Sequence, residues 1–448
     1  MKIAYIAAGA AGMYCGSCLR DNTLAAALQK LGHDVALIPT YTPLRTDEAD
    51  VSIDRIFYGG INVYLEQKFA LFRHTPWVFD KLLNNRALLN WVSRFSLSTN
   101  AQDLGALTTS MLAGEEGRQS KELARLVGWL KQTYQPDLVQ LTTSMFAGFA
   151  REIKKALGVP VLCALQGDDI FLEGLIEPYK SQSLRLLRER AKEIDGFIAS
   201  SRYYANFMAD YLNLPAKKIH AVRLGLHLQG HGLQTSANGS DAFALGYLAR
   251  ICPEKGLHLL VEAFHLLAQE LGRNHIRLKV AGYLGQRDRA YLASLVSKID
   301  AWGLQDSFEF FGEVDRAQKI RFLQSLHVLS VPTTYKEPKG LYILEALANG
   351  IPVVQPRHGS FPELIESTGG GILVEPESPE AIARGVLSML RDPALRHRFG
   401  QQGKAVVHRD FSDLKMAEET VEVYRQYVLE AHGERGVLSR DRGLKIEG

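Results

Sequence analysis

Short apolar runs alternate with longer amphipathic stretches along most of the chain. The apolar runs are typical of buried strands, and stretches with an apolar residue at every third or fourth position are typical of helices. Two sets of strands are predicted, at 3–9, 34–39, 136–141, 159–165, 195–200 and 218–224, and at 243–249, 276–282, 307–312, 327–332, 351–356 and 371–376. Helical stretches such as 18–32, 145–158, 202–212 and 255–271 separate most of these strands. The alternation predicts an α/β fold with two mostly parallel sheets, each covered by helices on both faces.

The segment between Gly225 and Ser240 is rich in Gly, His, Ser and Gln and has no periodic apolar residues. Such a segment is typical of a linker. A chain of 448 residues is long enough for two domains, and clefts between lobes are where small ligands bind. We therefore expect an N-terminal Rossmann-like domain, a linker, a second Rossmann-like domain, a helix and a loose tail, at 1–225, 226–240, 241–410, 411–433 and 434–448.

One insertion, at about 52–96, interrupts the pattern of the first half. It begins as a predicted hairpin turned at Gly59 and Gly60, and its later part, 69–95, mixes aromatic and aliphatic residues with arginine and lysine. A helix with apolar and basic faces can lie on an anionic membrane surface or line an acceptor site. The alternative is an amphipathic element that packs on its own domain.

The composition restricts the class of protein. A net charge of +3 gives no reason to expect a nucleic-acid partner, and no apolar run approaches the roughly 20 residues that span a bilayer. Four cysteines are too few for a disulfide framework in a chain of this length, which favours a reducing cytoplasm. We expect a cytoplasmic protein, with peripheral contact to the inner membrane face through 69–95 as an open option.

Two of the cysteines, Cys15 and Cys18, form a C-x-x-C at the start of a predicted helix, where the helix dipole can lower a thiol pKa. No second cysteine pair or histidine stands at zinc spacing. No metal site is predicted, and a redox role and a close-packed loop remain the alternatives.

The sharpest chemical signal is the stretch EPKGLYILEALANGIP at 337–352, which follows a predicted buried strand. A glycine that opens a helix presents the amides of Gly340 and Leu341 at its positive end, which is an anion site. Glu345 falls about one turn into the helix, where its carboxylate can accept hydrogen bonds from a ribose diol. Glu337 precedes the helix and can face a reacting sugar.

These residues resemble the E-x7-E signature of family 4 of the retaining glycosyltransferases, which have the GT-B fold. The resemblance continues through GYLARICPEKGLHLLVEAF, the later VAG and FFGEV, and IPVVQPRHGSFPELIESTGGGILVEP. It implies two Rossmann-like domains facing a central cleft, with a C-terminal helix that crosses back to the first domain. It also implies transfer of a hexosyl-type unit from a nucleoside diphosphate sugar, with UDP, GDP or ADP as the nucleotide, and with retention of configuration.

The same resemblance implies roles for individual residues. Arg250 and Lys255 would pair with the donor diphosphate, Glu345 would bind the ribose, and Glu337 would lie near the transferred sugar. No metal or other cofactor is expected. The acceptor would be a saccharide or a lipid-linked saccharide, in the synthesis of a cell-envelope polysaccharide or a glycolipid.

The first half resembles the family less closely. Its glycine turn carries Gly12 and Tyr14, and in the family the backbone of this turn approaches the donor phosphates and the acceptor, although a tight structural turn is the alternative. Gln166 stands where many relatives carry a histidine, on the acceptor side. Asp168 or Asp169 would act as a base or orient an acceptor hydroxyl, and the competing interpretation is a helix N-cap.

Two other functions are alternatives. A dinucleotide-dependent oxidoreductase needs G-x-G-x-x-G, and Gly9, Gly12 and Gly16 have the wrong spacing. A sugar-nucleotide-binding protein without catalysis would not need both Glu337 and Glu345 beside the two cations. A turnover assay discriminates it from the transferase.

Overall fold

The computed structural model describes residues 1–9, 16–57, 101–233 and 242–443. The chain divides into two compact units. Met1–Gly225 and Leu414–Gly448 form the first, and Leu226–Asp413 form the second. The predicted hairpin turn and the stretch 69–95 lie outside the described residues.

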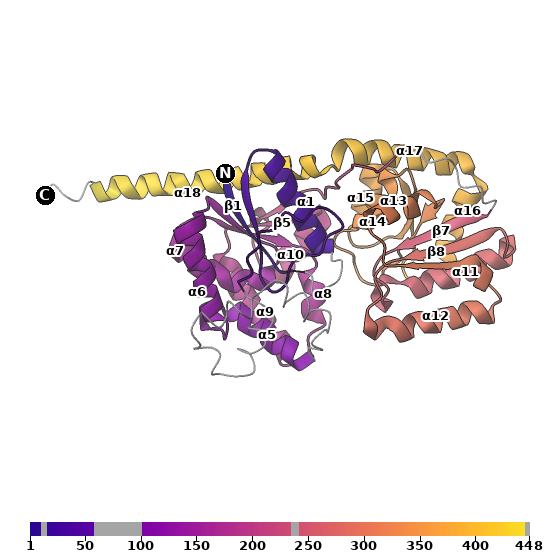
Figure 1. Ribbon diagram of the computed structural model, residues 1–448, viewed down its shortest axis with the longest axis horizontal. Coiled ribbons are helices and arrows are strands. Elements are labelled where there is room, and N and C mark those ends of the chain that lie inside the picture. The colour runs from indigo at the N-terminus through magenta and orange to yellow at the C-terminus, as the bar shows by residue number, and fades with distance from the viewer. Residues whose placement is uncertain (10–15, 58–100, 234–241, 444–448) are drawn as a thin grey trace. The chain divides into compact units, whose positions relative to one another are not determined.

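The first unit is built on a parallel sheet of six strands in the order β2-β1-β3-β4-β5-β6 (Figure 1). The strands are β1 (Lys2–Ala7), β2 (Asp34–Pro39), β3 (Leu138–Leu141), β4 (Val161–Leu165), β5 (Gly196–Ala199) and β6 (Ile219–Ala221). The helices of this unit are α1 (Gly16–Lys30), α5 (Ala101–Ala113), α6 (Ser120–Trp129), α7 (Ala150–Leu157), α8 (Asp168–Glu173), α9 (Tyr179–Arg190), α10 (Arg202–Leu212) and α18 (Asp413–Gly443).

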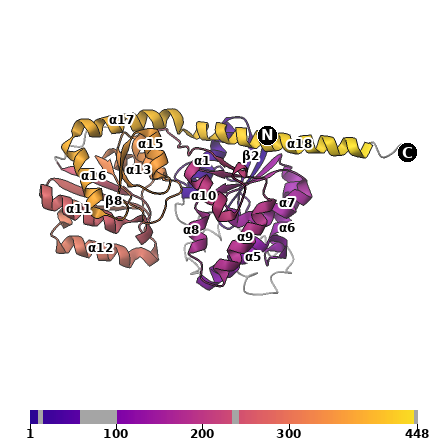
Figure 2. The ribbon, with the colours of Figure 1, turned by 180° about the vertical axis from the view of Figure 1, so that it is seen from behind.

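Alternate residues of these strands enter two separate cores, because successive side chains point to opposite faces of a sheet. Ala4 and Ile6 of β1 pack with residues of α6, α7, α9 and α10. Ile3 and Tyr5 pack with residues of α1 and α18 on the other face. Both faces are therefore covered, as parallel sheets require, and α18 runs along the α1 side (Figures 1 and 2).

The second unit repeats this architecture with the strand order β12-β11-β10-β7-β8-β9. Its strands are β7 (Phe243–Leu248), β8 (Ile276–Ala281), β9 (Phe308–Gly312), β10 (Val328–Leu329), β11 (Val353–Pro356) and β12 (Gly371–Val374). Its helices are α11 (Leu257–Leu271), α12 (Arg289–Ala301), α13 (Arg316–Gln324), α14 (Leu341–Ala348), α15 (Phe361–Thr368), α16 (Pro379–Arg391) and α17 (Pro393–Asp410). Figure 1 shows α11 and α12 on one face of this sheet, and α13, α14 and α15 on the other.

The predicted fold class of two Rossmann-like units is confirmed, and each predicted strand coincides with an observed one. Two boundaries differ from those expected. The predicted linker residues 226–233 belong to the second unit, where the Asn349 Nδ2 atom lies 2.8 Å from the His231 Nδ1 atom. The C-terminal helix continues to Gly443, beyond its predicted end at 433.

Within the part of the chain that the structure describes, no helix has both the length and the apolar character needed to cross a bilayer.

Candidate functional site

The helix α14 begins where the glycine signal predicts. Gly340 is its N-cap residue, with a φ of 75°, a left-handed conformation that favours glycine. A Cβ atom at this position would lie 3.0 Å from the Leu364 Cδ1 atom, so the glycine also permits close packing. The backbone at Gly340 and Leu341 therefore forms the positive terminus of a helix that is buried from Tyr342 onward.

Glu337 lies just before this helix and is only 4% exposed. The Lys255 Nζ atom is 2.5 Å from its Oε2 atom. The same oxygen accepts hydrogen bonds from the hydroxyl groups of Tyr335, at 2.8 Å, and Tyr342, at 3.4 Å. The backbone amide of Lys339 donates to the other oxygen, at 3.4 Å. The carboxylate is thus held from several sides.

Lys255 is enclosed by the same tyrosines, since its Nζ atom lies 5.0 Å from the centre of the Tyr335 ring and 5.4 Å from that of Tyr342. Burial alone would raise the pKa of Glu337, but the Lys255 charge and the hydrogen bonds from Lys255 and Tyr335 lower it below its usual value. Lysine and glutamate therefore form a charged pair beside the helix terminus.

Arg250 follows β7 and is exposed, and its Nε atom donates to the Cys252 sulfur at 3.4 Å. Burial and the Glu337 charge raise the pKa of Tyr335, whereas the Arg250 charge opposes this shift. Arg250 therefore acts electrostatically on Tyr335, which itself contacts Glu337.

Glu345 is the second predicted acid of this helix and is 6% exposed. Its Oε1 atom lies 2.5 Å from the Nζ atom of Lys319, which is itself buried, on α13. The motif did not identify Lys319. The available signal was its position on the apolar face of its helix, three and four residues before Phe322 and Leu323, which are also buried.

On the first unit, Gln166 follows the carboxyl end of β4 and is buried. Its amide nitrogen donates to the Asp21 carboxylate at 2.9 Å and to the Thr142 carbonyl at 3.1 Å. Asp21 also accepts from the Tyr5 hydroxyl at 2.7 Å. Burial raises the pKa of Asp21, and the Arg20 charge opposes this shift. Gln166 therefore belongs to a buried polar cluster that joins β1 and α1 to the segments that follow β3 and β4.

The Asp168 carboxylate accepts hydrogen bonds from the Thr143 hydroxyl, at 2.6 Å, and from the amide and hydroxyl of Ser144, at 3.2 and 3.0 Å. The N-cap residue of α8 is Gly167, with no side-chain cap, so the N-cap interpretation of Asp168 is wrong. The reason is that Asp168 is the first residue of α8 itself, and its side chain connects this helix to the loop after β3. Burial raises its pKa, and these hydrogen bonds oppose that shift.

Asp169 accepts a hydrogen bond from the Tyr204 hydroxyl at 2.5 Å. The Tyr204 hydroxyl also accepts from the Gly167 amide, at 2.9 Å. Burial raises the pKa of Asp169, and the Tyr204 hydrogen bond opposes it. The remaining predicted residues of this unit, Gly12, Tyr14 and Cys15, lie outside the described residues, and Cys18 is buried on α1.

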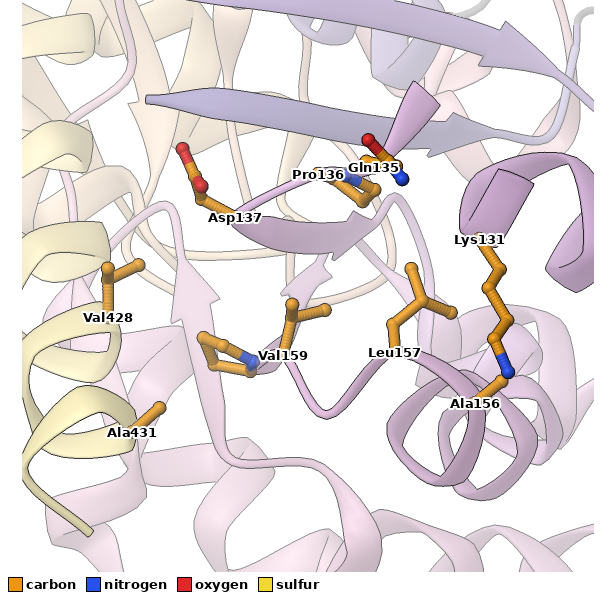
Figure 3. Close-up of a pocket in the computed structure, with 10 residues that line it drawn as sticks. Lys131, Gln135, Pro136, Asp137, Ala156, Leu157, Val159, Val428 and Ala431 are labelled. Atoms are coloured by element: carbon orange, nitrogen blue, oxygen red, sulfur yellow. The ribbon is translucent and has the colours of Figure 1, made fainter. Parts of the chain in front are cut away.

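A surface pocket of about 400 Å³ lies at the amino ends of β3 and β4, and its lining includes Lys131, Asp137 and Val428 of α18 (Figure 3). Gln166 and Asp168 follow the opposite end of β4, so this pocket is separate from the predicted acceptor side. Among the described side chains, no three His, Cys, Asp or Glu residues gather in a way that would hold a metal ion.

The sequence matches two protein families: "Glycosyl transferase 4-like domain" over residues 22–225 and "Glycosyl transferases group 1" over residues 234–406. An uncharacterized glycosyltransferase of Methanocaldococcus jannaschii is 32% identical over 179 residues, which cover 40% of this chain and 44% of the relative. A D-inositol 3-phosphate glycosyltransferase of Kineococcus radiotolerans is 31% identical over 211 residues, 45% of this chain and 48% of that protein. The chain thus spans about half the length of these relatives.

Solved structures show the same fold at lower identity. HepE of Anabaena, in complex with UDP, superposes with a TM-score of 0.67 at 18% identity, covering 95% of this chain and 100% of HepE. Sucrose-phosphate synthase of Thermosynechococcus elongatus gives a TM-score of 0.68 at 17% identity, covering 95% and 98%. Because both of its halves match, the chain belongs to the group 1 glycosyltransferases.

Proposed function

We propose that the protein transfers a hexosyl-type unit from a nucleoside diphosphate sugar to a saccharide or lipid-linked saccharide, with retention of configuration. The observation that carries the proposal is the Lys255–Glu337 pair beside the N-terminus of α14, with Glu345 further along the same helix. A HepE structure is described as a complex with UDP-glucose, which supports a nucleotide sugar as the ligand of this fold.

In the proposed donor complex, the diphosphate binds at the positive end of α14, where the amides of Gly340 and Leu341 and the charges of Lys255 and Arg250 neutralise it. These groups stabilise the negative charge that grows on the leaving nucleotide as its bond to the sugar breaks. Glu345 accepts hydrogen bonds from the ribose.

Glu337 faces the transferred sugar in this proposal and is not the nucleophile. Its Oε2 atom accepts hydrogen bonds from the Lys255 ammonium group and from two tyrosine hydroxyls, which hold the carboxylate in place. A carboxylate held in this way is suited to orient a sugar hydroxyl. The acceptor oxygen forms the new bond to the anomeric carbon on the face from which the phosphate oxygen leaves. The proton of the acceptor passes to that departing oxygen.

The donor site is tested by saturation-transfer NMR and slow hydrolysis with UDP-, GDP- and ADP-glucose. Glu345→Ala and Lys255→Ala should each weaken nucleotide-sugar affinity by about ten-fold or more, because each removes a charge-assisted hydrogen bond. Lys298→Ala breaks a solvent-exposed pair with Glu262 in the same unit and should leave affinity unchanged. Normal turnover by a folded Glu345→Ala variant would exclude this donor site.

Retention is tested by following the anomeric configuration of the released sugar by NMR before mutarotation. Binding of a nucleotide sugar without turnover, in the presence of a panel of saccharide acceptors and with no slow hydrolysis, would instead favour a non-catalytic binding protein. The peripheral membrane contact through 69–95 stays a prediction, which vesicle sedimentation with and without that stretch tests.

A further inference from the structure

A buried ion pair lies at the proposed ribose site, and only one of its two residues, Glu345, belongs to the sequence motif. Lys319 and Glu345 come from α13 and α14, and their side chains are only 10% and 8% exposed. Removing two charges from water is costly, so such a pair is weak evidence for a contribution to stability. Its presence at a proposed ligand contact therefore points to a role in binding.

Both partners of the pair are held by their own elements. α13 begins with a capping box in which the Asp315 carboxylate accepts from the Gln318 amide and the Gln318 side chain accepts from the Asp315 amide. On α14, the Glu345 carbonyl accepts from the Asn349 side chain at 2.9 Å, and Asn349 also contacts His231. Each side chain of the pair therefore extends from a helix with one end held by side-chain hydrogen bonds.

The hydrogen-bonding capacity of the carboxylate leaves room for a ligand. An ionised carboxylate offers about four acceptor positions, and the Lys319 ammonium group occupies one of them at the Oε1 atom. The remaining positions are sufficient for the two hydroxyl groups of a ribose diol. Lys319 also restricts the rotation of the Glu345 side chain, which would otherwise lose rotamer freedom when the ligand binds.

We infer that Lys319 is a positioning residue that aims Glu345 at the ribose 2′- and 3′-hydroxyl groups and so makes the donor site select ribonucleotides. This inference rests on the proposed function, because it assigns a further residue to the same nucleotide site. It predicts that loss of Lys319 weakens the binding of ribonucleotides more than that of 2′-deoxyribonucleotides. A residue that only supports the fold would weaken both equally.

The test uses calorimetric titration of the full chain with UDP, ADP and GDP and with their 2′-deoxy counterparts. For the nucleotide that binds best, the wild-type protein should bind the 2′-deoxy form about ten-fold more weakly, since one hydrogen bond to a charged group is lost. Lys319→Met should weaken binding of the ribonucleotide by about ten-fold and binding of the 2′-deoxy form by less, so that the ratio of the two affinities falls. Lys319→Arg, which keeps the charge, should restore most of it.

Lys298→Met is the matched control, since Lys298 forms an exposed pair with Glu262, at 2.7 Å, in the same unit. It should retain wild-type discrimination. Lys319→Gln keeps a donor without the charge and serves if the methionine variant does not fold, with the same expected fall in discrimination.

The possible failures are distinguishable. If the wild-type protein binds none of the three nucleotides, the proposed donor site is wrong and the inference falls with it. If the wild-type protein binds and the folded Lys319 variants keep full discrimination, the inference alone is wrong. Tighter ribonucleotide binding by Lys319→Met would also overturn it, since the lysine would then compete with the ribose.

Discussion

Two acidic side chains that the sequence motif singles out are both buried, and each is paired with one lysine. Lys255 lies 2.5 Å from Glu337, and Lys319 lies 2.5 Å from Glu345. A buried carboxylate that lost its cation would remain as an uncompensated charge, which is strongly destabilising. Replacing one partner of a pair therefore leaves the other as an unpaired buried charge, and the measured loss of stability includes the cost of that charge.

Removing Lys255 should make the stability of the second unit depend differently on pH. With Lys255 present, the folded-state pKa of Glu337 is below its usual 4.5, so the stabilisation is present above that pH and is lost as the pH falls through the lowered pKa. In Lys255→Met the burial of Glu337 remains and raises its pKa, because the opposing charge is gone. The variant therefore loses stability as the pH rises through the range in which carboxyl groups ionise. We expect a deficit of about 3 kcal/mol at neutral pH, which narrows on acidification.

Thermal unfolding of both proteins between about pH 4 and pH 8 measures this deficit. Lys298→Met, which removes an equally charged but exposed side chain, should follow the wild-type curve. A deficit that is constant across the range would mean that Lys255 does not control the ionisation of Glu337.

The residues of the candidate donor site could be predicted from sequence, but most of their partners could not. Glu337, Glu345 and Lys255 stand in a recognisable order along the chain. Their contacts depend on packing, since 82 positions separate Lys255 from Glu337 and 26 separate Lys319 from Glu345. Periodicity places a lysine on a helix face but does not tell which carboxylate lies opposite.

At the level of elements, the strands were predictable because buried parallel strands are continuous apolar runs. Their ends were less so. The predicted strand 327–332 contains only the short ladder of Val328–Leu329. α8 was anticipated only by the N-cap interpretation of Asp168 or Asp169, because its six residues are too few for helical periodicity to be recognised.

The loop between β11 and α15 packs directly on the backbone of Glu337. Gly359 has a φ of 60°, and a Cβ atom there would lie 2.6 Å from both the nitrogen and the oxygen of Glu337. An alanine in the left-handed conformation lowers the stability of the fold by about 1–2 kcal/mol, and the clash with Glu337 should make the loss in Gly359→Ala larger. The substitution should also displace Glu337 and so reduce turnover.

Gly303→Ala is the matched control. Gly303 has a φ of 68° and no atom within 4 Å of the added methyl position, so it carries the backbone strain without the clash. Differential scanning calorimetry and a turnover assay of both variants separate the two effects. Equal losses of stability in the two variants, with normal turnover, would show that the loop accommodates a methyl group beside Glu337.

At the scale of the whole molecule, the division into two units was predictable, but the position of the linker was not. Residues 226–233 lack apolar periodicity and so resemble a free connection. They are held in the second unit by polar contacts, among them the 2.7 Å hydrogen bond from the Lys404 Nζ atom to the Gly232 carbonyl. Such contacts leave no periodic signal in a sequence.

The first unit depends on α18, whose Tyr424 side chain is fully buried in the core that also contains Tyr5 and Leu24. Tyr424→Ala should destabilise this unit by about 3–5 kcal/mol, because it opens a large cavity. Among the described residues, the Tyr424 hydroxyl has no hydrogen-bond partner, so Tyr424→Phe should change stability by less than about 1 kcal/mol.

Hydrogen exchange measured by mass spectrometry resolves the two units, which a single melting temperature does not. In Tyr424→Ala, faster exchange should be confined to the strands of the first unit, with β7 to β12 protected as in the wild type. Loss of protection in both units together would show that they unfold cooperatively.

The membership of α18 in the first unit also bears on how the chain folds during synthesis. The N-terminal sheet leaves the ribosome first, but one of its two cores lacks Met416, Ala417, Val421 and Tyr424 until the whole of the second unit has been made. The second unit, by contrast, is a continuous segment, Leu226–Asp413, that is complete earlier. The half that is translated first is therefore the half that finishes folding last, and a nascent chain that stops short of α18 exposes an apolar sheet face to chaperones and proteases.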